Sequence, residues 1–135
     1  MILPFVELPN PDGSYVSRPA AYVRLEGLDL PLLCIIDSGA NKNRFGVDIA
    51  RAAGIDLPQP DAGKLAVGGE RDITMYTVGG LQLAIGDMTW NADVTFCDPW
   101  PEDFPNLLGV EGFFRHFRVT IRAVDFVVEI ERETW

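Results

Sequence analysis

The chain has 135 residues, of which 47% are hydrophobic, and it contains 13 glycines and 10 prolines. This length suffices for one hydrophobic core but is short for two, so we expect a single domain over residues 1–135. The composition favours a turn-rich, mostly β protein over a helical bundle or a disordered segment. The formal net charge of −9 argues against a nucleic-acid partner, whose phosphates require basic surfaces.

The sequence carries no sign of a membrane span or a signal peptide. No apolar run approaches the length of a membrane-spanning helix, and no basic segment precedes the apolar residues at the start. The two cysteines, Cys34 and Cys97, lie in apolar, strand-like segments and do not make a disulfide framework. We therefore expect buried free thiols and a reducing, cytoplasmic location.

Apolar runs and turn residues predict short strands in the first half of the chain. The expected strands cover residues 2–8, 20–25 and 30–36, and the expected loops cover residues 10–13 and 41–44. Residues 47–53 have apolar positions at helical spacing, and Gly54 follows them as a C-terminal cap. The first half should thus hold three strands and one short helix.

In the second half, the expected strands cover residues 64–67, 73–78, 81–85, 90–96, 117–122 and 126–130. The first two would form a hairpin with its tip at residues 68–72, although Gly79-Gly80 offers a rival turn. The third and fourth alternate apolar with polar residues, so we expect them to be half exposed. Three prolines exclude regular strand from residues 98–105. The last two strands would pair as a closing hairpin.

The stretch of most chemical interest is the apolar run 32–36, which is followed at once by Asp37, Ser38, Gly39 and Ala40. The run predicts a strand buried on both faces that ends on an acid. An unpaired buried carboxylate is costly or shifts its pKa, so Asp37 needs dedicated partners or partial protonation. Gly39 permits a tight turn and Ala40 keeps it uncrowded. The stretch aims one acid outward, or it is an ordinary Asx-type turn.

Asp37-Ser38-Gly39-Ala40 behind an apolar strand resembles the Asp-Thr/Ser-Gly-Ala signature of retropepsin-like aspartic proteases, the single-domain relatives of pepsin. Further along, Leu107-Leu108-Gly109 resembles the family's two-apolar-then-Gly element, which a short helix follows. Between them, Val67-Gly68-Gly69 resembles the family's flap. Pro4-Phe5 and Arg18-Pro19 are most similar to bacterial, free-standing members. The resemblance therefore covers nearly the whole chain.

The resemblance implies a closed β-barrel of the acid protease fold with one or two short helices. It also implies an aspartic endopeptidase acting on peptide or protein substrates, with Asp37 as the catalytic residue and with no cofactor or metal. Peptide hydrolysis by carboxylates requires two of them, which share one proton. Because the chain has only one Asp-Ser-Gly, Asp37 of a second copy would complete the site in a homodimer.

By the same resemblance, three segments would assist Asp37. They are Ser38, Gly39, Ala40 and Asn41 of the signature loop, Val67, Gly68 and Gly69 of the flap, and Leu107, Leu108 and Gly109 of the supporting element. Ser38 would link the signature loops of two copies, and the carbonyl of Gly39 would accept a substrate N–H. Asn41 stands where retroviral members often have Asp, which keeps hydrogen-bonding capacity and loses charge.

Other interpretations remain open at this point. The chain could be a non-catalytic dimerisation or peptide-binding module on the same barrel. A glycosidase also needs two acids, but nothing places a partner for Asp37 within one chain. Lys42 and Arg44 are either solvated basic residues or determinants of a preference for acidic substrate side chains. His116 is the only histidine, so neither a His-based triad nor a metal-ligand spacing is supported.

Overall fold

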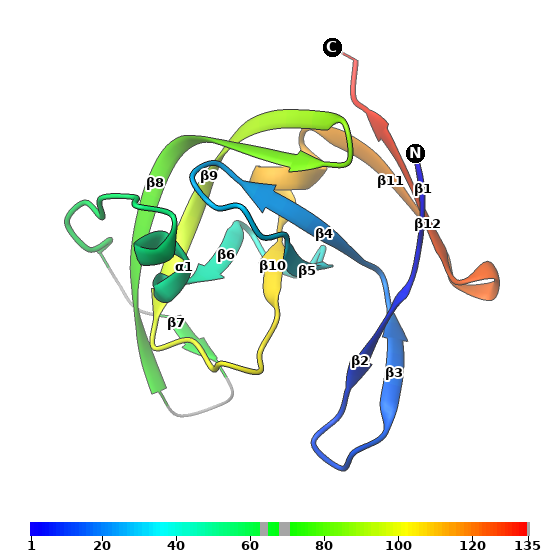
Figure 1. Ribbon diagram of the computed structural model, residues 1–135, viewed down its shortest axis with the longest axis horizontal. Coiled ribbons are helices and arrows are strands. Elements are labelled where there is room, and N and C mark those ends of the chain that lie inside the picture. Colours follow the sequence, from blue (N-terminus) through cyan, green and yellow to red (C-terminus); the bar gives the residue numbers. More distant parts are fainter. Residues whose placement is uncertain (63–64, 68–70, 135) are drawn as a thin grey trace.

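The structure is a computed structural model that describes residues 1–62, 65–67 and 71–134. Six strands follow one another in the order β4-β5-β10-β6-β9-β8, and β8 pairs back onto β4, so the sheet closes into a barrel (Figure 1). They are β4 (Ala20–Leu25), β5 (Leu32–Ile36), β6 (Asn43–Gly46), β8 (Arg71–Ile85), β9 (Met88–Asp98) and β10 (Asn106–Leu108). The predicted mostly β, closed-barrel fold is confirmed.

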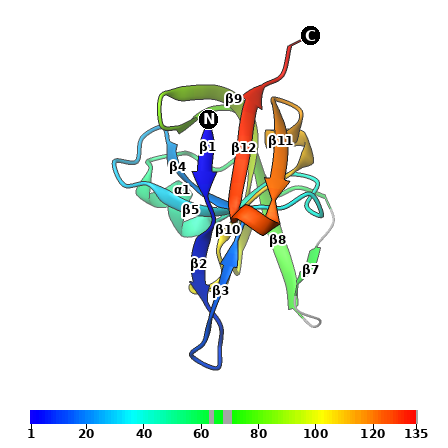
Figure 2. The same cartoon turned by 90° about the vertical axis from the view of Figure 1, so that its right-hand side faces the viewer.

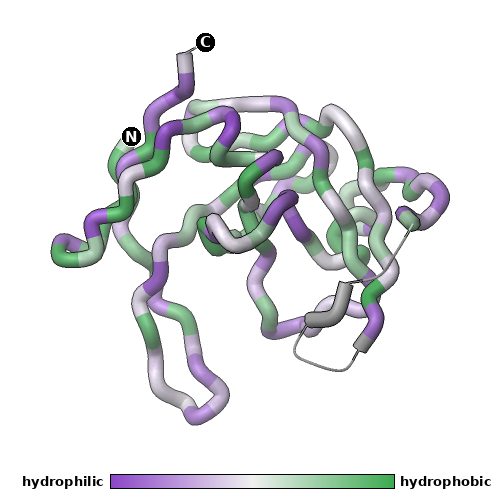
Figure 3. Tube along the Cα trace, turned by 180° about the vertical axis from the view of Figure 1, so that it is seen from behind, coloured by the Kyte–Doolittle hydropathy of each residue, from purple (hydrophilic) through white to green (hydrophobic). Residues whose placement is uncertain are grey.

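Two smaller sheets lie outside the barrel. The hairpin of β2 (Val6–Pro9) and β3 (Tyr15–Arg18) projects away from it, and its tip is hydrophilic (Figures 1 and 3). In the second sheet β12 (Val127–Arg132) lies between β1 (Ile2–Pro4) and β11 (Phe117–Arg122), along one side of the molecule (Figure 2). This sheet brings the two ends of the chain together.

The remaining elements are short. Strand β7 (Leu65–Val67) pairs with the start of β8 as a hairpin arm. The helices are α1 (Val47–Ala52), the single π-helical turn η1 (Val110–Phe114) and the 3₁₀ turn η2 (Ala123–Asp125). Gly54 ends α1 in the left-handed region at φ +71°, as its predicted role as a cap requires. Within the described ranges, no helix has the length and apolar character needed to cross a membrane.

Large apolar side chains fill the barrel. The rings of Phe45 and Phe96 meet edge to face at 6.3 Å and expose no surface. Trp90, Phe113 and Phe117 form a second aromatic cluster with centroids 5.1 to 5.6 Å apart. Full burial of one such side chain contributes about 2–3 kcal/mol. Both cysteines are buried as free thiols, as predicted.

Several element boundaries differ from the sequence prediction. Residues 2–8 form two strands in different sheets, and β3 was not predicted. The predicted loop at residues 41–44 ends in β6, because Asn43 and Phe45 both point into the core. Gly79-Gly80 does not turn the chain: β8 runs through it with an irregular register between Val78 and Leu81.

The exposure of β9 also differs from the prediction. Residues 94–97 are all buried, although alternating exposure was expected. The segment before β7 packs on this face: the Asp61 carboxylate accepts the Thr77 hydroxyl at 2.5 Å, and that hydroxyl lies 2.9 Å from the Thr95 hydroxyl. Alternation in a sequence reports one solvated face only where nothing packs on that face.

One buried polar side chain, Asn43, joins β6 to two other parts of the chain. Its Nδ2 donates to the carbonyls of Gly112 at 3.1 Å and Asp93 at 3.3 Å, and its Oδ1 accepts the N–H of Gly109 at 3.1 Å. Asn43 has no exposed surface, so water cannot replace these partners. Segments 43–46, 88–98 and 109–114 are thus held together by one amide.

Replacing Asn43 with alanine should lower the free energy of unfolding by about 3 kcal/mol, because buried backbone groups lose their partner. Urea denaturation measures this loss. The matched control is Asn91→Ala, since Asn91 is exposed and its amide donates to the carbonyl of Gly80 at 3.1 Å. This control substitution should lower the free energy of unfolding by less than about 1 kcal/mol. Equal losses for the two variants would contradict the role assigned to Asn43.

Candidate active site

The signature loop, residues 37–41, turns away from the end of β5. The N–H of Asp37 donates to the carbonyl of Leu108 at 3.0 Å, and the N–H of Ala40 donates to the carbonyl of Asp37 at 3.2 Å. The Oδ1 atom of Asp37 accepts the N–H of Gly39 at 2.8 Å. This is the hydrogen bond of an Asx turn, and it fixes the orientation of the carboxylate.

The Asp37 side chain is half-buried, and its second oxygen, Oδ2, makes no hydrogen bond to any residue of the described ranges. An added Cβ at Gly39 would lie 3.1 Å from Oδ1, so glycine leaves room for the carboxylate. The Asx turn and the outward-facing acid are therefore features of the same loop and do not exclude each other.

Strand β10 supports the loop from beneath. It runs parallel to β5, with Leu107 opposite Ile35 and Leu108 opposite Ile36. Beyond β10, the N–H of Val110 donates to the carbonyl of Ala40 at 2.8 Å, and that of Glu111 donates to the carbonyl of Asn41 at 2.7 Å. Backbone hydrogen bonds thus tie the signature loop to residues 108–111.

Gly109 lies where the loop and the support touch. A Cβ at this position would overlap the carbonyl of Lys42 and lie 2.7 Å from the carbonyl oxygen of Ala40. Both obstacles are backbone atoms, which cannot rotate away as a flexible side chain would. The close contact therefore requires glycine at position 109.

The face of the sheet that carries Asp37 can be followed across the barrel wall from the register of the strands. Directly opposed residues on five neighbouring strands form one row: Ile35, Leu107, Arg44, Thr95 and Thr77. Opposed residues point to the same side of a sheet. Asp37 follows Ile35 by two residues and continues its face by alternation. This face is apolar beside Asp37 and becomes polar at β6, β9 and β8.

A cavity of about 240 Å³ lies at the polar part of this row. Its lining comes from β6 and the loop before it, from β8 and β9, and from the segment before β7; it consists of Lys42, Arg44, Asp61, Ala62, Met75, Thr77 and Thr95. Beneath it, burial raises the pKa of the Cys97 thiol, and the nearby Arg44 guanidinium partly opposes that rise. The cavity borders the signature loop through Lys42, which directly follows Asn41.

The structure brings two of the three predicted site segments together. Ser38, Gly39 and Asn41 are exposed on the signature loop, while Ala40 is buried against the supporting element. Val67 belongs to β7, in the hairpin predicted as the flap. Gly68 and Gly69 lie outside the described residues. The functional roles of all these residues stay predictions.

Sequence reasoning missed Asn43 and Gly112. The carbonyl of Gly112 accepts both the Asn43 amide and the indole N–H of Trp90, the latter at 2.8 Å. An added Cβ at Gly112 would overlap the Asn43 side chain. The available signal was the pattern Asn43-Arg44-Phe45, in which an amide takes an inward position of a strand beside a core aromatic residue.

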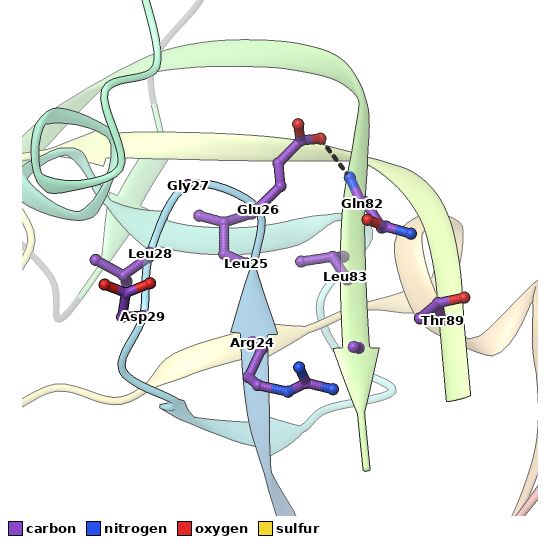
Figure 4. Close-up of a pocket in the computed structure, with 10 residues that line it drawn as sticks. Arg24, Leu25, Glu26, Gly27, Leu28, Asp29, Gln82, Leu83 and Thr89 are labelled. Atoms are coloured by element: carbon purple, nitrogen blue, oxygen red, sulfur yellow. Dashed lines mark hydrogen bonds between the residues drawn. The ribbon is translucent and has the colours of Figure 1, made fainter. Parts of the chain in front are cut away.

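A larger cavity, about 390 Å³, opens where β8 closes onto β4 (Figure 4). None of its lining residues belongs to the signature loop. Glu26 accepts the backbone N–H of Gln82 at 2.6 Å, and Arg24 donates to the carbonyl of Gly86 at 2.6 Å. These side chains hold the closure of the barrel. In the described part of the chain, no three His, Cys, Asp or Glu residues gather as metal ligands would.

Comparisons with known proteins agree with the barrel. No protein-family model and no curated protein matches the sequence. A retropepsin-like aspartic protease from Rickettsia conorii has a similar structure, with a TM-score of 0.58 and 15% identity over 96% of this chain and 91% of its own. The EIAV protease, solved with an inhibitor, has a TM-score of 0.50 and 18% identity over 68% and 81%.

The closed barrel and the supported acidic loop define an acid protease fold. More narrowly, the similarity over nearly the whole chain shows that this protein has the retropepsin fold. At these identities the similarity establishes architecture, and chemistry must be argued from the site.

Replacing Gly109 with alanine should lower the free energy of unfolding by about 3 kcal/mol, since the methyl group forces the loop away from β10. Thermal denaturation measures the effect. The matched control is Gly13→Ala: Gly13 has a φ of +87°, and nothing lies within 4 Å of an added Cβ. An alanine held at this positive φ should lower the free energy of unfolding by about 1 kcal/mol through backbone strain alone. A loss at Gly109 no larger than at Gly13 would refute the proposed close contact.

Proposed function

We propose that this protein is an aspartic endopeptidase that hydrolyses peptide bonds as a homodimer. A water molecule would be held between the Asp37 carboxylates of the two copies. The observation that carries this proposal is a half-buried carboxylate with one oxygen fixed by the N–H of Gly39 at 2.8 Å, on a loop tied to β10. The sequence holds one such motif, so the second carboxylate comes from another copy.

The chemistry follows from placing the two acids together. Carboxylates about 3 Å apart cannot both ionise, so the pair shares one proton. The ionised Asp37 takes a proton from the water as the water oxygen attacks the peptide carbonyl carbon. The protonated Asp37 gives its proton to the carbonyl oxygen. The Asp37 that took the water proton then gives it to the leaving nitrogen, and the C–N bond breaks. As the C=O bond re-forms, a hydroxyl proton of the intermediate passes to the other Asp37, so the pair again holds one proton.

Other residues of the signature loop fit supporting roles. The Ser38 side chain is exposed, and its hydroxyl makes no hydrogen bond within the described ranges, so it is free for a contact across the two-fold axis. The exposed backbone of Gly39 would accept a substrate N–H. The hairpin of β7 and β8 would cover the bound peptide and exclude water.

The substrate class is a peptide in extended conformation. Ile35 and Leu107 are half-buried apolar residues on the same face as Asp37, and they would contact an apolar side chain next to the scissile bond. The free thiols of Cys34 and Cys97 are consistent with a reducing compartment, and we place the protein in the cytoplasm.

Replacing Asp37 with asparagine should abolish peptide cleavage and preserve the dimer. Mixing gives the sharper result, because a variant subunit inactivates each dimer that it joins. After exchange, the activity per wild-type subunit should fall to about half at equal amounts and about a tenth at roughly ninefold excess of the variant. The assay combines cleavage of an unfolded protein with sedimentation analysis of the mixture.

The matched control for the mixing experiment is Asp56→Asn, which changes an exposed acid outside the site. It should leave cleavage unchanged in any proportion. Full activity per wild-type subunit in the presence of Asp37→Asn would rule out a shared site. A wild-type dimer that binds peptides without cleaving them at acid to neutral pH would instead favour the non-catalytic module.

Replacing Ser38 with alanine should weaken the dimer, because it removes the hydroxyl that would form a hydrogen bond with the other copy. We expect the dimer dissociation constant to rise about tenfold, whereas Ser38→Thr retains the oxygen and should keep the wild-type value. Sedimentation velocity over a concentration series measures both. Ser17→Ala, on the projecting hairpin, serves as the control. An unchanged dissociation constant for Ser38→Ala would place the dimer contact elsewhere.

A further inference from the structure

We infer that the cavity lined by Lys42 and Arg44 is a subsite for an acidic side chain of the peptide substrate. The inference rests on the proposed function, because it names the substrate class of that same site. It concerns a part of the peptide close to the bond that is cut.

The position of the cavity follows from the sheet register. Arg44 of β6 lies two strands away from Ile35 of β5, with Leu107 of β10 between them. Neighbouring strands are spaced by about 4.8 Å, so β6, which carries Arg44, lies about 10 Å from β5. An extended peptide covers this distance in about three residues. The acidic side chain should therefore occur within about three residues of the scissile bond.

Arg44 is a half-buried cation with poor partners. Its Nη1 donates to the sulfur of Met75 at 3.1 Å, and its guanidinium lies near the Cys97 thiol. Sulfur atoms are weak acceptors, whereas guanidinium groups form their strongest hydrogen bonds with carboxylates. Within the described ranges, no acidic side chain forms an ion pair with Arg44 or Lys42. A substrate carboxylate would thus replace sulfur contacts with charged hydrogen bonds.

The one acid in the cavity, Asp61, is already engaged. Its Oδ1 accepts the N–H of Thr77 at 3.2 Å, and its Oδ2 accepts the Thr77 hydroxyl at 2.5 Å. Because the Thr77 hydroxyl donates its hydrogen to Asp61, it can only accept a hydrogen bond from the Thr95 hydroxyl, whose oxygen lies 2.9 Å away. Thr95 is 1% exposed, which shows that this network is built into the wall. Asp61 is therefore held on the wall side of the cavity.

The charge balance leaves one positive charge unmatched. Two cations and one carboxylate line the cavity, on a chain with a net charge of −9. A local positive site in an acidic protein attracts an anionic side chain while the rest of the surface repels it. Because Arg44 belongs to strand β6 and is half-buried, it does not fit the alternative of a solvated basic loop.

The test compares peptides that differ only in charge. Wild-type protein is incubated with an unstructured peptide library, and the cleaved products are sequenced. We expect Asp and Glu to be enriched at one position near the scissile bond. For a matched pair of peptides with Glu or Gln there, kcat/KM should favour Glu by roughly tenfold, as expected for a hydrogen bond between charged groups. The double variant Lys42→Gln/Arg44→Gln should lose this preference.

The control is Arg18→Gln, which removes an exposed cation from the projecting hairpin and should keep the preference for Glu. Lys42→Glu, a change at an exposed position, keeps the test decisive if the double variant does not fold, and it should disfavour Glu. Cleavage without acidic preference, or an unaltered preference in these variants, overturns the inference and leaves the proposed function standing.

If the wild type cleaves nothing, the same library is captured on immobilised Asp37→Asn protein. Enrichment of acidic peptides that disappears when Lys42 and Arg44 are also replaced supports the subsite, although the proposed endopeptidase activity then fails. Capture without acidic enrichment, or no capture at all, overturns the subsite.

Discussion

The amide of Asn43 accepts the N–H of Gly109 and donates to the carbonyls of Gly112 and Asp93. These three backbone groups come from the supporting element, the turn after it and β9, so one fully buried side chain sets their distances. The signature loop rests on the same supporting element through hydrogen bonds from Asp37, Val110 and Glu111. The orientation of the acid thus depends on a polar contact inside an otherwise apolar barrel.

A rigid loop is what a shared carboxylate pair requires. Two acids raise each other's proton affinity only if they stay within a few ångströms, and a mobile loop would let them separate. The close approach at Gly109 and the Asx hydrogen bond of Gly39 restrict Asp37 before any second copy arrives. In the proposed homodimer, each chain would therefore supply half of a preorganised site, and the apolar face beside Asp37 would form one wall of the peptide groove.

The sequence predicted the elements whose signals are local. An apolar run that ends in Asp-Ser-Gly defines a strand and its turn within a few residues. Strand β10 was not predicted, because Leu107 and Leu108 were recognised only through the family resemblance. Strand β6 was missed because Asn43 resembles a loop residue until its partners, 50 and 69 residues away, are known. Gly79-Gly80 resembles a turn, but the long pairing of β8 with β9 carries the strand through it. The cavity was not predicted, since its row of residues depends on sheet register.

The central claim is that two copies of one loop form one catalytic pair. A crystal structure that includes the symmetry-related molecules tests it most directly. The account predicts a two-fold axis beside the signature loop, with the two Asp37 carboxylates facing each other within about 3 Å. Carboxylates that point apart, or a dimer that buries the loop against an unrelated surface, would contradict it.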